Sequence, residues 1–255
     1  MAGGLNEVDD SQSSVFALDP TTGQSPQVGN VPSAFHDGAG AVIDGRLVVF
    51  GGGASQGTYL VQSFDPTTAR GAVIGRMPKA LSDVSSATIA GVAYVVGGYD
   101  GTTAQAAIYA TRDGRRFHRI GALPVGLRYT AVAGLGSSLF VAGGVTQSGT
   151  SVASVYRVDT RSGAVTPVGN LGMPVGHAAA FVRHGRLFVA GGRDSAGDAV
   201  ATTWSIDPST GRIRKGPPLP ASVADAAVAT SAHGTWLIGG WRSGTVLMQV
   251  LMVPD

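Results

Sequence analysis

The residues best suited to chemistry share one position relative to a repeated glycine pair. Five pairs begin at residues 51, 97, 143, 191 and 239, and a polar or aromatic residue stands fourteen residues before each. These residues are Asp37, Asp83, Tyr129, His177 and Asp225. Three further polar groups stand one step earlier, at His36, Ser82 and Arg128. Such side chains bind cations and sugar hydroxyls and exchange protons, and if the repeats close around an axis they form a ring at one mouth of a central channel.

The three aspartates decide which ligand such a ring would take. If five repeats close around an axis, Asp225, Asp37 and Asp83 become neighbours. They then form an acidic arc opposite the aromatic and basic members of the ring, Tyr129 and His177. This arrangement favours a cationic or polyhydroxyl ligand, or a metal ion. The structural alternative is that the same groups cap strand ends and hold water in a central channel.

Spacing disfavours a tight metal site in this ring. Calcium takes oxygen ligands at about 2.3–2.6 Å, whereas facing sheets pack about 10 Å apart. Adjacent carboxylates would have to lean well inward to share one ion. A larger ligand therefore fits better, and we expect no metal and no cofactor.

Most signatures of catalysis are missing from the sequence. The chain has no cysteine, which excludes disulfides, thiolate nucleophiles and cysteine-ligated zinc. Gly38-Ala39-Gly40 begins like a dinucleotide fingerprint, but no third glycine and no helical segment follow it. Carboxylate pairs for sugar chemistry remain open within the acidic arc. The sequence therefore leans away from an enzyme without excluding one.

The densest basic run does not favour nucleic acid. It consists of Arg112, Arg115, Arg116, His118 and Arg119. Phe117 is the single aromatic residue within it, and single-stranded nucleic acids are held by stacking aromatics along a basic groove. The net charge of the whole chain is only +2. We expect a solvated face here and no nucleic-acid partner.

The elements that must position the ring follow from the repeat itself. Successive glycine pairs are 46 to 48 residues apart, and Gly3-Gly4 adds a sixth copy. A fixed period near 50 is typical of a propeller or a solenoid. Each pair is preceded by a strand of small residues, such as 38–41, and then by a bulkier apolar strand, such as 47–50. Small residues suit the crowded axis of a propeller, and continuous apolarity suits a strand covered on both faces.

Two more polar strands follow each glycine pair and complete a four-stranded blade. They are separated by a turn of the type Asp-Pro-Thr-Thr-Gly at 19–23, with related turns beginning at Asp65, Asp159 and Asp207. In such a turn the aspartate bonds back to the backbone and proline presets φ. We therefore expect one all-β domain over residues 1–255, with glycine pairs at 3–4, 51–52, 97–98, 143–144, 191–192 and 239–240.

These features resemble the kelch-repeat β-propellers of the galactose-oxidase central-domain superfamily. The resemblance rests on the glycine pair, the small inner strand, and an aromatic residue twelve or thirteen positions after the pair: Phe16, Phe64, Tyr109, Tyr156 and Trp204. The outermost tryptophan usual in kelch repeats is replaced by Phe117 in one repeat only, and 111–117 is also similar to a sialidase-type Asp-box. The resemblance implies ligand binding at the mouth of the channel, by the ring named above.

The number of blades depends on how the two ends of the chain meet. Five inner-strand pairs are present, and the segment 246–254 offers a third strand to the last of them. The strands expected at 14–18 and about 25–30 can then close that blade and remove its exposed edge. We expect five blades, and the alternative is a six-bladed parent with an incomplete blade.

Three functional hypotheses follow. The leading one is a non-catalytic binding or sensing module that takes a protein, peptide or carbohydrate at the channel mouth. The second is a carbohydrate-active enzyme that uses Asp37, Asp83, Asp225 and His177 as acid and base groups, and the third is a purely structural scaffold. No apolar segment approaches the roughly 20 residues needed to span a bilayer. Localisation stays open, since an exported bacterial protein and a cytosolic one fit equally well.

Overall fold

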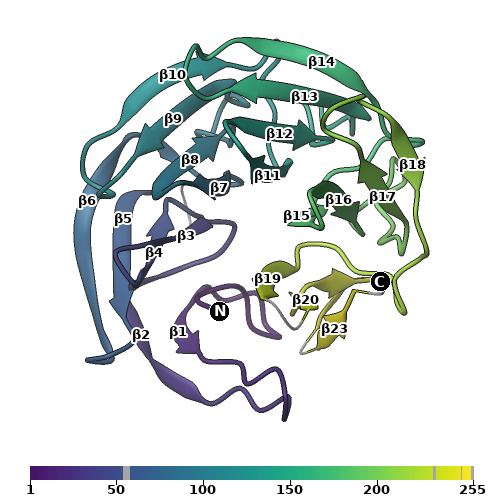
Figure 1. Cartoon of the computed structure of the whole chain (residues 1–255). Helices are drawn as coiled ribbons and strands as arrows, with labels where there is room; N and C mark the ends of the chain where they lie inside the picture. Colours follow the sequence, from purple (N-terminus) through teal and green to yellow (C-terminus); the bar gives the residue numbers. More distant parts are fainter. Residues whose placement is uncertain (54–57, 232–233, 248, 254–255) are drawn as a thin grey trace.

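The computed structural model describes residues 1–53, 58–231, 234–247 and 249–253. No described residue is helical, so this part of the chain holds no helix that could cross a membrane. The sheets stand around a central axis, and the chain passes from each one to its neighbour (Figure 1). The predicted all-β propeller is confirmed, with five blades built on inner-strand pairs.

Four blades have four antiparallel strands each, ordered from the axis outward. The first contains β3 (Ala39–Ile43), β4 (Arg46–Phe50), β5 (Thr58–Asp65) and β6 (Arg70–Leu81). The second contains β7 (Ser85–Ile89), β8 (Val92–Val96), β9 (Ala107–Thr111) and β10 (His118–Ala122). The third contains β11 (Ala131–Leu135), β12 (Ser138–Ala142), β13 (Ser154–Asp159) and β14 (Val165–Asn170). The fourth contains β15 (Ala179–Arg183), β16 (Arg186–Ala190), β17 (Thr203–Ile206) and β18 (Ile213–Lys215).

The two ends of the chain form the remaining sheets. The fifth blade is β19 (Ala227–Ser231), β20 (Gly234–Ile238) and β23 (Val250–Met252), with a short hairpin of β21 (Trp241–Arg242) and β22 (Thr245–Val246) beside it. A separate two-stranded sheet is made by β1 (Gln12–Phe16) and β2 (Gln27–Phe35). The predicted third strand at the C-terminus is confirmed by β23, which pairs with β20; Met248 and Pro254 of the predicted segment lie outside the described residues.

The predicted closure of the last blade by the N-terminal strands is not found among the described residues. Instead, β1 pairs with β2. The reason lies in the first blade, whose Val49 and Phe64 are apolar side chains on the face that no other blade covers. Val15, Val31 and Phe35 of the β1–β2 sheet pack on that face and bury it.

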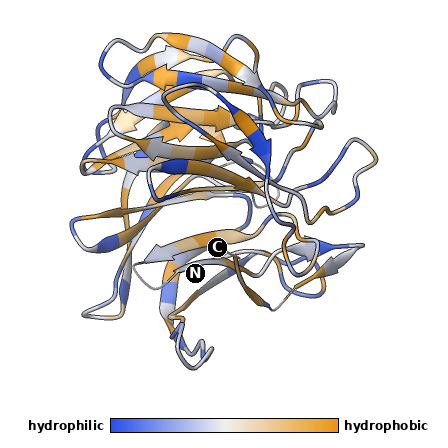
Figure 2. Cartoon of the chain, turned by 45° about the vertical axis from the view of Figure 1, so that its right-hand side comes forward, coloured by the Kyte–Doolittle hydropathy of each residue, from blue (hydrophilic) through white to orange (hydrophobic). Residues whose placement is uncertain are grey.

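Burial explains why each repeat has one small strand and one bulky strand. All five residues of β8 are buried, and so are all five of β12, because neighbouring blades cover both of their faces. The inner strands pack against one another around the axis, β3 on β7, β7 on β11, β11 on β15 and β15 on β19. In Figure 2 the apolar residues follow the strands, while the connecting loops are mostly hydrophilic or neutral.

The predicted turn chemistry is present in the outer hairpins. The Asp65 carboxylate accepts hydrogen bonds from the amides of Thr67 (2.9 Å) and Thr68 (3.3 Å). Asp19 does the same with Thr21, whose hydroxyl and amide hydrogen bonds lower the pKa of Asp19 to about 2. These carboxylates therefore work as turn-formers, and they leave the polar residues of the channel mouth as the candidates for function.

The glycine pair ends the second strand of every blade in a conformation that side chains resist. Gly143 has φ +61°, and a Cβ built on it would lie 2.2 Å from the carbonyl oxygen of Val175. The amide of Gly144 donates to that same carbonyl at 2.8 Å. The same bond recurs from Gly52 to Leu81 and in the two other complete blades. The pair thus lets the chain segment that enters the next blade lie directly against the end of the second strand.

Gly143→Ala is expected to destabilise the protein by more than about 2 kcal/mol. The left-handed backbone alone costs an L-residue about 1–2 kcal/mol, and here the new methyl group would also meet a backbone oxygen that cannot move freely. The urea midpoint of unfolding measures the loss.

The matched control is Gly149→Ala, in an exposed loop of the same blade. Gly149 has φ +80°, but a Cβ there meets nothing within 4 Å. Only the backbone cost of about 1–2 kcal/mol should remain. Equal losses in the two variants would contradict the close-approach argument.

Candidate functional site

The backbone places the five predicted ring residues around the axis. The amide of Asp83 donates to the carbonyl of Asp37 at 2.8 Å, and the amide of Tyr129 donates to the carbonyl of Asp83 at 3.0 Å. The chain of bonds continues from His177 to Tyr129 (2.9 Å) and from Asp225 to His177 (3.0 Å). Each ring residue after Asp37 is therefore held to the one in the preceding blade, and all five lie at one mouth of the channel.

All five ring residues adopt the left-handed backbone conformation. Their φ values are 51° for Asp37, 57° for Asp83, 53° for Tyr129, 58° for His177 and 57° for Asp225. Aspartate and histidine visit this region more often than most residues, whereas for a bulky residue such as tyrosine it is an outlier. Strain of this kind persists where the surrounding structure enforces it, and it gathers at functional sites.

The side chains of Asp37, Tyr129 and His177 meet across the channel. The Tyr129 hydroxyl donates to Oδ2 of Asp37 at 3.0 Å, although the two residues are two blades apart. The Tyr129 ring also stacks on the His177 imidazole, with centroids 3.7 Å apart and an angle of 22°. Three of the five ring members thus form one contact group.

Asp225 is shared between two donors from the preceding blade. Its Oδ1 lies 2.5 Å from Nδ1 of His177, and its Oδ2 accepts a bond from Nη2 of Arg193 at 2.6 Å. The guanidinium of Arg193 in turn stacks on the Trp241 ring at 3.9 Å. Both oxygens of the carboxylate are therefore engaged, and an arginine and an indole are brought to the same edge of the mouth.

Asp83 has its own partner on the other side of the ring. Nη1 of Arg128 lies 3.2 Å from Oδ2 of Asp83, whose side chain is only 6% exposed. The same guanidinium lies over the rings of Tyr99 (4.8 Å) and Tyr129 (5.3 Å). The sequence did predict Asp83 and Arg128 for the site, and the structure brings them together as an ion pair.

The acidic arc is therefore not a bare row of carboxylates. Of the seven predicted site residues, six are joined in the pairs described above. The seventh, His36, lies at the edge of the mouth and receives Ser11 from the N-terminal segment, with Oγ and Nδ1 2.9 Å apart. Among the described residues, no group of three His, Cys, Asp or Glu side chains is arranged to hold a metal ion.

Sequence reasoning missed a second layer of the mouth. The residue that follows each glycine pair forms a β-bridge with the residue that precedes each ring position. These bridges join Gly53 to His36, Tyr99 to Ser82, Val145 to Arg128, Arg193 to Gly176 and Trp241 to Ala224. Tyr99, Arg193 and Trp241 therefore line the site, and the position directly after the glycine pair is the feature of the sequence that identifies them.

The pKa values of two carboxyl groups in the ring are shifted in opposite directions. Burial, and then the charges of Asp225 and Asp83, raise the pKa of Asp37 above its ordinary value. Burial alone would also raise the pKa of Asp225, but His177 and Arg193 outweigh it and the pKa of Asp225 lies below its ordinary value. Burial and the carboxylates of Asp37 and Asp83 raise the pKa of Tyr129, which keeps its hydroxyl a donor.

Two buried donors in the site have no acceptor. The Nε atoms of Arg128 and Arg193 are both buried, and neither has a hydrogen-bond partner among the described residues. Buried donors without a partner are rare in native structures, and each one calls for an explanation. The two arginines stand in different blades, and each is stacked on an aromatic ring.

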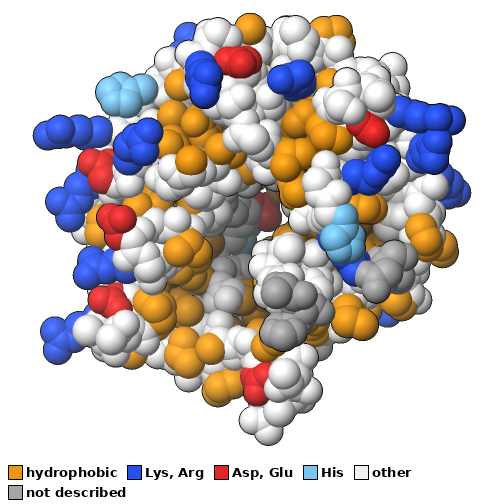
Figure 3. Space-filling model, viewed as in Figure 1, with side chains coloured by type: hydrophobic (Ala, Val, Ile, Leu, Met, Phe, Trp, Pro, Cys, Tyr) orange, Lys and Arg blue, Asp and Glu red, His pale blue; other side chains and the backbone are white. Residues whose placement is uncertain are grey.

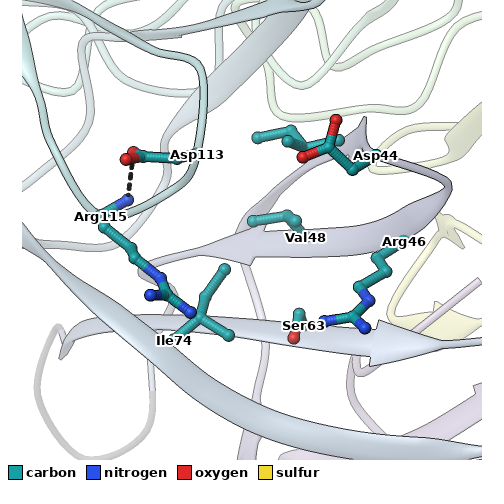
Figure 4. Close-up of a pocket in the computed structure, with 8 residues that line it drawn as sticks. Asp44, Arg46, Val48, Ser63, Ile74, Asp113 and Arg115 are labelled. Carbon is teal, nitrogen blue, oxygen red and sulfur yellow. Dashed lines mark hydrogen bonds between the residues drawn. The ribbon is translucent and has the colours of Figure 1, made fainter.

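Two cavities lie away from the ring residues, and strands of the first and second blades line them. One of about 410 Å³ is lined by Asp44, Arg46, Ser63, Asp113 and Arg115, among others (Figure 4). Another of about 390 Å³ lies beside Arg112, Arg116 and His118. The basic run thus frames two shallow openings. Figure 3 shows one face of the molecule. The Lys and Arg side chains of that face lie mostly at its rim, and acidic side-chain atoms are visible in the hollow at the axis.

Comparisons with known proteins agree with this architecture. The kelch motif model matches residues 174–220. A solved structure, "Structure of YjhT", superposes with a TM-score of 0.84 at 16% identity, covering 100% of this chain and 94% of that chain. No curated protein matches the sequence. The chain is thus a five-bladed β-propeller, and its glycine-pair repeat and the kelch motif at residues 174–220 make it similar to kelch-repeat propellers.

Proposed function

We propose that this propeller is a non-catalytic binding or sensing module whose ligand sits at the channel mouth, on Asp37, Asp83, Tyr129, His177 and Asp225. One observation carries the proposal. Five polar or aromatic residues from five different blades are all held in a left-handed conformation, and their side chains are joined at one end of the axis. A kelch propeller fold suits a binding or scaffold role, and this site favours binding.

A purely structural scaffold accounts less well for the same residues. A raised carboxyl pKa means that the folded protein disfavours the charged form of Asp37, so this residue weakens the fold near neutral pH. The backbone strain at Tyr129 adds a further cost. Residues that oppose stability are expected where they serve a ligand. The buried Nε donors of Arg128 and Arg193, which have no acceptor among the described residues, also favour a ligand-binding role over a purely structural one.

The chemistry of the mouth favours a compact polyhydroxyl ligand such as a monosaccharide. Carboxylates and guanidinium groups bind hydroxyl pairs, and the indole of Trp241 and the ring of Tyr99 offer apolar faces beside them. A peptide with hydroxyl or amide side chains would use the same donors and acceptors, and it is the alternative ligand for this site.

A second candidate function is acid–base catalysis on a carbohydrate, and the opposite pKa shifts of Asp37 and Asp225 favour it. Paired carboxyl groups whose environments separate their pKa values divide into an acid and a base. Asp37 would be the acid, and Asp225 with His177 would form the base. Release of a chromophore from aryl glycosides, abolished in Asp37→Asn, would support this candidate over simple binding.

Arg193→Ala is expected to weaken monosaccharide binding by about 10- to 100-fold. The estimate takes about 1.5–3 kcal/mol for a hydrogen bond to a charged group. Isothermal titration with neutral, amino and acidic monosaccharides, and with short hydroxyl-rich peptides, identifies the ligand class and measures the loss.

The matched control for that experiment is Arg186→Ala in the same blade. Arg186 forms an exposed ion pair with Asp207 at 3.3 Å, away from the mouth. Its loss should leave the affinity unchanged. Equal affinity in wild type and Arg193→Ala, or no binding by any compound of the panel, would contradict the proposed site.

Asp37→Asn and Asp225→Asn should shift thermal stability in opposite directions at pH 7. Because the folded-state pKa of Asp37 is raised, its ionisation destabilises the fold above the ordinary pKa of 3.8, and asparagine removes that penalty. The folded-state pKa of Asp225 is lowered, so its charge stabilises the fold above 3.8 and that contribution is lost as the pH falls.

Melting temperatures between pH 3 and pH 8 measure both effects. At pH 7, Asp37→Asn should melt above wild type and Asp225→Asn below it. The ionisation part of the Asp37→Asn difference should vanish near pH 3, below the ordinary pKa of 3.8, whereas that of Asp225→Asn should be lost only as the pH falls through the lowered folded-state pKa of Asp225. A lower melting temperature for Asp37→Asn at pH 7 would refute the assigned pKa direction.

A further inference from the structure

The cavity of about 390 Å³ lies where the second and third blades face each other. Strands β8, β9 and β10 of the second blade line it, and Thr160, in the turn between β13 and β14, adds a residue from the third blade. The Thr160 hydroxyl donates to the Ser137 carbonyl at 2.9 Å, so this turn is held in place. The volume suits a small molecule, whose sites usually measure about 300–1,000 Å³. None of the ring residues of the mouth lines this cavity.

The floor of the cavity is a row of paired residues across the three strands, which lie side by side in Figure 1. Tyr94 on β8 pairs with Ala110 on β9, and Ala110 pairs with His118 on β10. Paired residues point to the same face of a sheet, so the small Ala110 leaves a gap between two rings. At the corresponding place in the third blade, Arg157 pairs with Phe140. A large side chain therefore stands there where the second blade has a gap.

The Tyr94 hydroxyl is a polar group that the fold does not use. Tyr94 is only 6% exposed, and it lines the cavity. Within the described part of the chain, its hydroxyl makes no hydrogen bond. The hydroxyl of a buried tyrosine usually has a partner. A polar group of a ligand in the cavity would supply that partner.

Three basic side chains border the same cavity without a partner of their own. Arg112, Arg116 and His118 are exposed, and their side chains form no hydrogen bond or ion pair with any described residue. Arg119 belongs to the opposite face of the blade, because it follows His118 on β10 and pairs with Tyr109. Its Nε donates to the Gly121 carbonyl at 3.4 Å. The cavity thus combines an apolar floor with an excess of positive charge.

The turn that carries the two arginines has a fixed backbone. Oδ1 of Asp113 accepts hydrogen bonds from the amides of Arg115 (2.8 Å, Figure 4) and Arg116 (2.9 Å). The Thr111 hydroxyl accepts another from the Gly114 amide at 2.9 Å. The amide of Arg116, and then that of Arg115, hold the pKa of Asp113 below its ordinary value. Asp113 also lines the cavity, but its Oδ1 is committed to the turn, which therefore presents its positive charges from a preorganised frame.

We propose that this cavity binds a small organic anion, an apolar body that carries one carboxylate or phosphate head. The body lies on Ala110 and the ring of Tyr94, and the head lies at Arg112 and Arg116. Guanidinium groups bind both kinds of head in bidentate geometry and also stack on aromatic faces, so a body of one or two aromatic rings fits best. The Tyr94 hydroxyl donates a further hydrogen bond to the head. The proposal does not depend on the ligand of the mouth.

The same basic run is less suited to a single-stranded nucleic acid. Such a strand stacks its bases on exposed aromatic side chains. Phe117, the aromatic residue of the run, instead packs against the core of the first blade. Its ring meets that of Phe50 edge-on, with centroids 6.1 Å apart and an angle of 85°. A compact anion needs no such stacking platform.

Titration with naphthoate and with naphthyl phosphate tests the cavity and distinguishes the two heads. Naphthylmethanol and naphthylmethylamine are the neutral and cationic matches, and isothermal titration calorimetry measures each affinity. At least one of the two anions should bind at one to one. It should bind at least about tenfold more tightly than either match, because hydrogen bonds to a charged head are the stronger ones.

Four variants locate the binding. Arg116→Ala should weaken anion binding by about 10- to 100-fold and Tyr94→Phe by about 2- to 10-fold. Arg119→Ala is the matched control, because it removes the same charge from the same run but from the opposite face, and it should keep the wild-type affinity. Arg193→Ala at the mouth should also keep it, so this proposal and the proposed function can fail separately. Far-UV circular dichroism confirms that each variant folds.

Three results would overturn the proposal. The first is that neither anion binds at millimolar concentration. The second is that the neutral match binds as tightly as the anions, which would leave only an apolar cleft. The third is an equal loss in Arg116→Ala and Arg119→Ala, together with tight binding of a single-stranded oligonucleotide, which would assign the basic run to nucleic acid.

Discussion

The hydrogen bond from the second glycine of the pair in each of the four complete blades holds the architecture together. Gly144 can donate to the Val175 carbonyl because Gly143 has no side chain in the 2.2 Å space before that oxygen. The bond pins the segment that leaves the outermost strand and enters the next blade. Fourteen residues before each glycine pair, and directly beside it in space, the chain reaches the axis. The glycine pair therefore recurs in the sequence because each complete blade makes this one backbone contact.

This contact explains why the site can be so polar. The positions of Tyr129, His177 and Asp225 are set by backbone bonds and by buried apolar residues on either side, so the path of the chain does not depend on which side chain stands there. The residue types at these positions can therefore differ according to the ligand. The packing of the blades enforces the strained left-handed backbone there. The four complete blades thus act as a rigid frame for a variable mouth.

The repeat period, the strand pattern and the ring register could all be predicted from the sequence, because each depends on neighbours within one blade. The partners of the ring side chains could not. Tyr129 reaches Asp37 across the channel and Arg193 joins Asp225 from a neighbouring blade, so both contacts depend on the diameter of the ring and on the rotamers. The role of β1 and β2 was also beyond local patterns, since it follows from the uncovered face of the first blade.

The carboxyl group of Asp37 links the electrostatics of the mouth to its contacts. Its pKa is raised by burial and by the charges of Asp225 and Asp83, and its Oδ2 accepts the hydrogen bond of the Tyr129 hydroxyl. A ligand that donates to Asp37 or brings a positive charge beside it would favour the ionised form of this carboxyl group. It would also change the contacts of Tyr129, whose ring stacks on His177. Ligand binding and the ionisation of Asp37 would then be coupled, with each altering the free energy of the other.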